Sequence, residues 1–199
     1  MKRLLPHIAA ALVAVQLLII FVSWLLSAAY QTSELRSLLS SEGLRWFFGQ
    51  FNMFLSRPLL VDLLLLSMAW GVLRKSGMLS YRSSYRESRA RMMTLFLLAV
   101  YIGVLLLLTV IPHAVLLSAT GHLWPSPFSR SIVSVVAFTV LSLSAFYGTI
   151  AGYFNTIADV YHAVLYGIRE GAPLLLFYVL LMQIVESLHF VCPSLLAIP

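Results

Sequence analysis

The sequence predicts an all-α integral membrane protein with about five transmembrane helices and two amphipathic helices that lie at the membrane interface. Of its 199 residues, 61% are hydrophobic and 10% are charged, whereas soluble domains carry about 25% charged residues. The mean hydropathy is +0.95. Apolar blocks near the roughly 20 residues that a helix needs to cross a bilayer recur along the chain. Several spans are therefore expected.

The expected spans are apolar blocks separated by polar or aromatic connections. They cover residues 8–29, 58–74, 92–118, 131–153 and 173–191. The first block follows Lys2 and Arg3, and its apolar core is longer than the roughly 7–15 residues of a signal peptide. We expect it to stay in the protein as a span.

Two segments have the periodicity of an amphipathic helix. Apolar residues recur at helical spacing in residues 41–56 and again in residues 155–170. Thr156 and Asp159 fit a capping box at the start of the second segment, with Asp in the acidic position. Because the remaining positions are polar, both helices are expected to lie flat at the interface.

The order span, flat helix, proline, span occurs twice, with Pro58 in the first copy and Pro173 in the second. Three expected spans separate the starts of the copies, so the second copy would be turned over in the membrane. This is the inverted repeat of many secondary transporters; the alternative is a chance likeness between leucine-rich spans. The expected organisation is a first half, a connecting span with an outer loop, and an inverted second half, at residues 1–91, 92–130 and 131–199.

The net charge of +6 is concentrated in the connection between the second and third spans. Glu87 is the one acidic residue in this connection, and its basic residues are Arg74, Lys75, Arg82, Arg86, Arg89 and Arg91. Basic residues near span ends stay on the cytoplasmic side. We therefore expect a cytoplasmic N-terminus and, with five spans, a C-terminus on the outer side. Contact with anionic lipid is the expected additional role, and beyond Tyr81 and Tyr85 the connection lacks the interleaved aromatic platforms of a nucleic-acid site.

Ionisable residues within spans are candidates for function. Asp62 follows Pro58 by about one turn; it either binds a cation or has a structural role, in contact with water or paired with Arg57. Gln183, Glu186 and His189 share much of one helix face. A carboxylate and an imidazole one turn apart could relay protons. The alternative is that they reach water or a partner helix near the outer surface.

Gly148 and Gly152 form a GxxxG pattern, which allows close approach of helices and favours a packing role. Cys192 is the only cysteine, and no set of metal ligands at a typical spacing is found. The motifs of serine hydrolases, zinc proteases, P-loop proteins and dinucleotide-binding enzymes are also missing from the sequence. We expect neither an enzyme nor a bound cofactor or metal.

Two long segments resemble the p-aminobenzoyl-glutamate transporters (the AbgT type). The first is SSEGLRWFFGQFNMFLSRPLLVDLLLLSMAWGVLRKSGML at residues 40–79. The second is LWPSPFSRSIVSVVAFTVLSLSAFYGTIAGYFNTIADVYHAVLYGI at residues 123–168, which is similar to the opening of that family's second half. VIPH followed by TGHLW resembles the connection before it. The resemblance implies the family's membrane fold and coupling to protons or sodium.

Members of this family also have two re-entrant hairpins that hold substrate and coupling ion, and we find no counterpart of them here. No substrate-binding residue is therefore assigned. We expect a protein of the bacterial inner membrane that resembles the family's scaffold and acts through helix–helix contacts, as a homo-oligomer or with another membrane protein. The alternative is a minimal or oligomeric transporter of p-aminobenzoyl-glutamate-like or antimetabolite substrates, in which Asp62 or Glu186 couples an ion.

Overall fold

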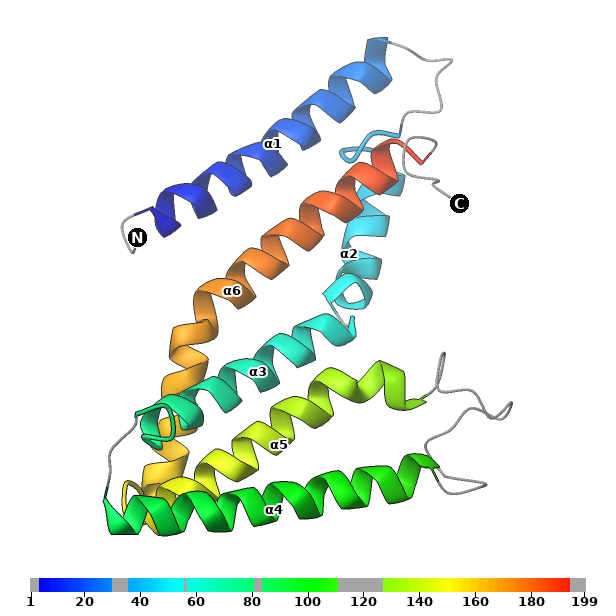
Figure 1. Cartoon of the computed structure of the whole chain (residues 1–199). Helices are drawn as coiled ribbons and strands as arrows, with labels where there is room; N and C mark the ends of the chain where they lie inside the picture. Colours follow the sequence, from blue (N-terminus) through cyan, green and yellow to red (C-terminus); the bar gives the residue numbers. More distant parts are fainter. Residues whose placement is uncertain (1–3, 30–35, 56, 81–83, 111–126, 194–199) are drawn as a thin grey trace. The chain divides into compact units, whose positions relative to one another are not determined.

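The computed structural model describes residues 4–29, 36–55, 57–80, 84–110 and 127–193. Every regular element in these ranges is a helix, and the all-α prediction is confirmed for them. The helices are α1 (Leu5–Ala29), α2 (Ser41–Leu55), α3 (Pro58–Lys75), α4 (Tyr85–Val110), α5 (Pro127–Ala151) and α6 (Ile157–Val191) (Figure 1).

Four of these helices, α1, α4, α5 and α6, are long and apolar enough to cross a membrane. This is the character of an integral membrane protein, because a helix satisfies its own backbone hydrogen bonds in lipid. Five spans were predicted, and the predicted span that is not among these four helices is α3. That helix has 18 residues, close to the short limit for a span. It also carries three charged residues, Asp62, Arg74 and Lys75, which lower its hydropathy.

Helices α4 and α5 begin before the predicted spans. Helix α4 begins at Tyr85, before the predicted start at residue 92. Ser84 and Glu87 have the spacing of a capping box, but Glu87 Oε1 accepts a hydrogen bond of 2.8 Å from the Tyr153 hydroxyl instead. Residues 111–118 of that predicted span lie outside the described residues. Helix α5 begins at Pro127, since proline suits the first position of a helix.

The separate amphipathic helix before Pro173 is a wrong prediction, because α6 continues through this proline as one helix of 35 residues. A proline removes a single backbone donor, and a helix among other helices tolerates that loss. The predicted capping box at the start of α6 is confirmed. Asp159 Oδ2 accepts hydrogen bonds from the N–H groups of Asn155 and Thr156, each at 2.9 Å, and Thr156 Oγ1 accepts the Asp159 N–H at 3.3 Å.

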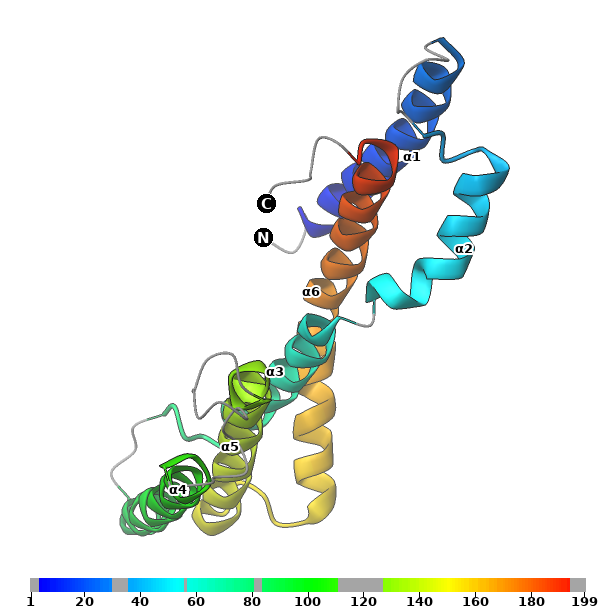
Figure 2. The same ribbon diagram turned by 90° about the vertical axis from the view of Figure 1, so that its right-hand side faces the viewer.

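The chain forms two compact units, the first made of Met1–Leu60 with Pro173–Pro199 and the second of Val61–Ala172. In the first unit the C-terminal half of α6 runs alongside α1 (Figure 2). Its core consists of Leu38, Phe190 and Val191, with Ile19, Ile20, Trp46 and Cys192 packed against them. The predicted amphipathic helix at residues 41–56 is present as α2.

The second unit contains most of α3, all of α4 and α5, and the N-terminal half of α6. Helices α4 and α5 lie side by side. The buried residues Val72, Phe154 and Ala163 form its core. Because Phe154 follows α5 in sequence and Ala163 lies in α6, the short turn between these helices is part of the core.

Candidate functional site

Glu186 lies on α6 in the first unit and forms an ion pair with Arg57, the residue before α3. The Glu186 side chain is 12% exposed, whereas that of Arg57 is 55% exposed. A buried carboxylate is costly in an apolar environment unless a cation or several donors accompany it. Arg57 had been a possible partner for Asp62, and the structure places it on Glu186.

The proposed relay partners of Glu186 do not bind it in the part of the chain that the structure describes. His189 is exposed and Gln183 is half-buried, and no hydrogen bond joins them to Glu186 within the described ranges. The buried polar residue on this part of α6 is instead Ser187, whose Oγ accepts a hydrogen bond of 2.8 Å from Gln16 Nε2 on α1. The sequence signal for this contact is that Gln16 is the only amide side chain in α1.

Asp62 connects two helices of the second unit. Its Oδ1 accepts a hydrogen bond of 2.7 Å from Ser134 Oγ, which brings α3 and α5 together. One turn further along α3, Leu65 lines an apolar groove of about 430 Å³ that Ser134 also lines, together with Tyr101, Val104, Leu105, Val135, Phe138 and Thr139. A carboxylate therefore lies close to an apolar surface between three helices.

Gly148 and Gly152 have different roles. A Cβ at Gly148 would lie 2.5 Å from the Phe154 ring and 3.2 Å from Ser76 Cβ, so this glycine lets neighbouring groups approach α5 closely. Gly152 has φ +85° and follows the last residue of α5. The Tyr153 N–H donates to Gly148 O at 2.8 Å and the Gly152 N–H to Thr149 O at 3.2 Å. These bonds form a Schellman motif, in which glycine suits the left-handed position.

The closest backbone approach described in the second unit occurs at other glycines. A Cβ added to Gly71 of α3 would lie 2.4 Å from the Gly167 backbone of α6, and one added to Gly167 would lie 2.1 Å from Ser67 O. Small residues spaced four apart, Ser67 with Gly71 on α3 and Ala163 with Gly167 on α6, provide this contact. These residues have the same spacing as Gly148 and Gly152, and this spacing is the sequence signal for the contact.

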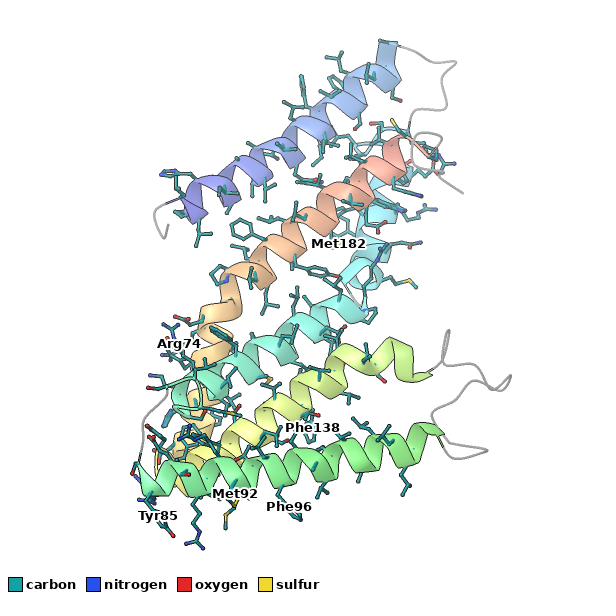
Figure 3. The ribbon with its side chains drawn as sticks, in the orientation of Figure 1. Arg74, Tyr85, Met92, Phe96, Phe138 and Met182 are labelled. Atoms are coloured by element: carbon teal, nitrogen blue, oxygen red, sulfur yellow. The ribbon has the colours of Figure 1, made fainter. Side chains whose placement is uncertain are left out.

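The basic residues of the predicted cytoplasmic connection take separate positions in the second unit. Arg74 pairs with Glu170 at 2.6 Å, and Figure 3 shows Arg74 at the end of α3 beside α6. The Arg86 Nε–H donates to Ile150 O at 3.1 Å, which satisfies a carbonyl at the end of α5. Arg89 is exposed and Arg91 half-buried. Arg82 lies outside the described residues.

A pocket of about 380 Å³ lies between the end of α3 and the first half of α6. Its lining consists of Lys75, Tyr153, Phe154, Asp159, His162, Ala163, Leu165, Tyr166 and Arg169. The Lys75 Nζ lies 4.4 Å from the centre of the Tyr166 ring, within the range of a cation–π interaction. Two cationic side chains, an imidazole and one carboxylate therefore surround this pocket.

No protein-family model, curated protein or solved structure matches this chain. Among the described residues, no group of three or more His, Cys, Asp or Glu side chains could hold a metal ion. The candidate sites therefore consist of the paired polar residues within the helices and the basic pocket of the second unit.

Proposed function

We propose that the protein is a multi-pass protein of the bacterial inner membrane that acts through helix–helix contacts, as a scaffold or an accessory subunit. The observation that carries the proposal is the ion pair between Glu186 and Arg57. A carboxylate that couples ion movement must bind and release its ion. A guanidinium at the same oxygen competes with that ion, so the pair favours a structural role for Glu186.

The outer face of α4 supports a role in association. Met92 and Phe96 project from α4 on the side away from α5 (Figure 3), and they are 73% and 74% exposed. In a membrane these side chains contact lipid or another helix. A surface of this kind provides room for a second copy or a partner membrane protein without disturbing the contact between α4 and α5.

The orientation and the inverted repeat belong to the same proposal. The exposed Arg89 and the other basic residues at the start of α4 favour the cytoplasmic side for this end of the second unit. In the inverted repeat, α2 and α3 would correspond to the two halves of α6. The copies then differ at their prolines, because Pro58 begins a helix and Pro173 lies inside one.

The alternative, a minimal transporter with p-aminobenzoyl-glutamate-like substrates, has one specific observation in its favour. Asp62 accepts a hydrogen bond from Ser134, and within the described ranges no cationic side chain pairs with it. A carboxylate in this state, close to an apolar groove, remains able to accept a proton or a sodium ion.

One experiment separates the two functions. The purified full chain is reconstituted into liposomes, uptake of radiolabelled p-aminobenzoyl-glutamate is measured under separate proton and sodium gradients, and chemical cross-linking reports association in the same vesicles. The scaffold proposal predicts cross-linked oligomers and no gradient-driven uptake. Uptake that is lost in Asp62→Asn and retained in a control variant, Ser142→Ala at a half-buried serine of α5, would overturn it in favour of transport.

A further inference from the structure

We propose that the pocket between the end of α3 and the first half of α6 binds the phosphate of an anionic phospholipid, with Lys75 and Arg169 as its cationic ligands. All the residues that line this pocket belong to the second unit. The inference goes beyond the scaffold proposal and does not depend on it.

The charges around the pocket leave two cations available for an anion. Arg74 is neutralised by Glu170, at 2.6 Å. Lys75 and Arg169 line the pocket, and neither forms an ion pair with a carboxylate in the part of the chain that the structure describes. His162 adds a third group that can donate a hydrogen bond.

The Tyr166 ring fixes the position of the Lys75 ammonium group without neutralising its charge. The ammonium lies 4.4 Å from the ring centre, so the ring face contacts one side of it and its remaining N–H groups can donate to another ligand. Lysine binds phosphate as a point charge, whereas arginine can donate two parallel hydrogen bonds to the same group. The two side chains are therefore complementary ligands for a phosphate.

Asp159 is the one carboxylate that lines the pocket, and its negative charge is offset by hydrogen bonds at the start of α6. Its Oδ2 accepts the N–H groups of Asn155 and Thr156, each at 2.9 Å, at the start of α6. These donors and the positive end of the helix dipole offset its negative charge. The second acidic group nearby, Glu170, is occupied by Arg74.

The other walls of the pocket favour a lipid over a soluble phosphate. Phe154, Ala163 and Leu165 present apolar surface beside the basic residues. A phospholipid headgroup combines a phosphate with a glycerol and acyl chains that can contact such a wall. Basic pockets between membrane helices bind headgroups of this kind.

The test measures binding of single lipids to the purified full chain by native mass spectrometry. Phosphatidylglycerol and phosphatidylcholine are titrated separately, and free glycerol 1-phosphate forms a third arm. We expect the first phosphatidylglycerol molecule to bind with higher affinity than the first phosphatidylcholine molecule. Millimolar glycerol 1-phosphate should not displace it. Displacement by free glycerol 1-phosphate would overturn the lipid assignment and indicate a soluble phosphate ligand.

Variants locate the binding site. The double variant Lys75→Gln/Arg169→Gln should weaken binding of the first phosphatidylglycerol by about 25-fold, from roughly fivefold for each basic residue. Arg89→Gln is the matched control, because Arg89 is exposed and does not line the pocket, and it should retain binding. If the double variant does not fold, Arg169→Gln alone should lose about fivefold. Equal losses in the pocket variants and in Arg89→Gln would overturn the site, since they would indicate diffuse attraction between charges.

Discussion

The two units join their helices by different means. In the first unit, side chains that are far apart in sequence bind one another, as Gln16 does with Ser187 and Arg57 with Glu186. In the second unit, α3 and α6 meet backbone to backbone at Gly71 and Gly167. Lipid gives no hydrophobic drive for association between helices, so polar contacts and close packing of small residues are the two available solutions. Polar pairs join the elements of the first unit, whereas the second unit combines close packing with polar contacts such as the hydrogen bond from Ser134 to Asp62.

The largest effect is expected from a substitution that breaks the backbone contact between α3 and α6 in the second unit. Gly167→Ala places a Cβ 2.1 Å from Ser67 O, a contact that the backbone cannot avoid without moving the helices apart. We expect a loss of about 3 kcal/mol in the free energy of unfolding, as for an overpacked core. The measurement is unfolding in mixed micelles, followed by circular dichroism during a titration with dodecyl sulfate.

Gly103→Ala on α4 is the matched control, because nothing lies within 4 Å of an added Cβ there. It should leave the stability unchanged or raise it by up to about 1 kcal/mol, since alanine is the better helix former. Equal effects of the two substitutions would contradict the close contact between α3 and α6.

A smaller effect is expected from the ion pair of the first unit. Arg57→Ala and Glu186→Gln, made singly and together, form a double-mutant cycle. We expect a coupling free energy of about 1–2 kcal/mol, below that of a fully buried pair because the Arg57 side chain is 55% exposed. The same micelle unfolding assay measures it, and a coupling near zero would show that the pair contributes nothing to the first unit.

The smallest expected effect concerns the hydrogen bond between α1 and α6. The cycle of Gln16→Leu with Ser187→Ala should give a coupling free energy of about 0.6 kcal/mol, the usual size for a hydrogen bond between membrane helices. Gln16 Oε1 is buried and has no hydrogen-bond partner in the described structure, so removing the whole amide also removes an unsatisfied group. Gln16→Leu alone should therefore cost little, and a loss above about 2 kcal/mol would contradict this account.

Features that depend on neighbouring residues were predictable. The capping box of Thr156 and Asp159 was identified from a spacing of three residues, and the structure forms it. The amphipathic helix of residues 41–56 is present as α2. The break at Pro173 was wrong, because the loss of one backbone donor does not end a helix whose other hydrogen bonds are kept.

Features that depend on distant residues were not predictable. Arg57 was considered as a partner of Asp62, which is close to it in sequence, and the structure pairs it with Glu186, 129 residues away. Gly152 fits the GxxxG spacing of a packing motif, yet its φ of +85° places it in the turn that ends α5. Spacing alone does not distinguish a glycine inside a helix from one just after it.

By itself, the sequence determined the all-helical character of the described chain, its apolar helices and the local signals that begin them. These properties follow from hydropathy, periodicity and capping, which act within a few turns of one helix. The tertiary structure alone decided which polar groups pair and where two backbones touch. Partners such as Gln16 and Ser187 are 171 residues apart, and such pairs are set by how the helices pack, which no local pattern encodes.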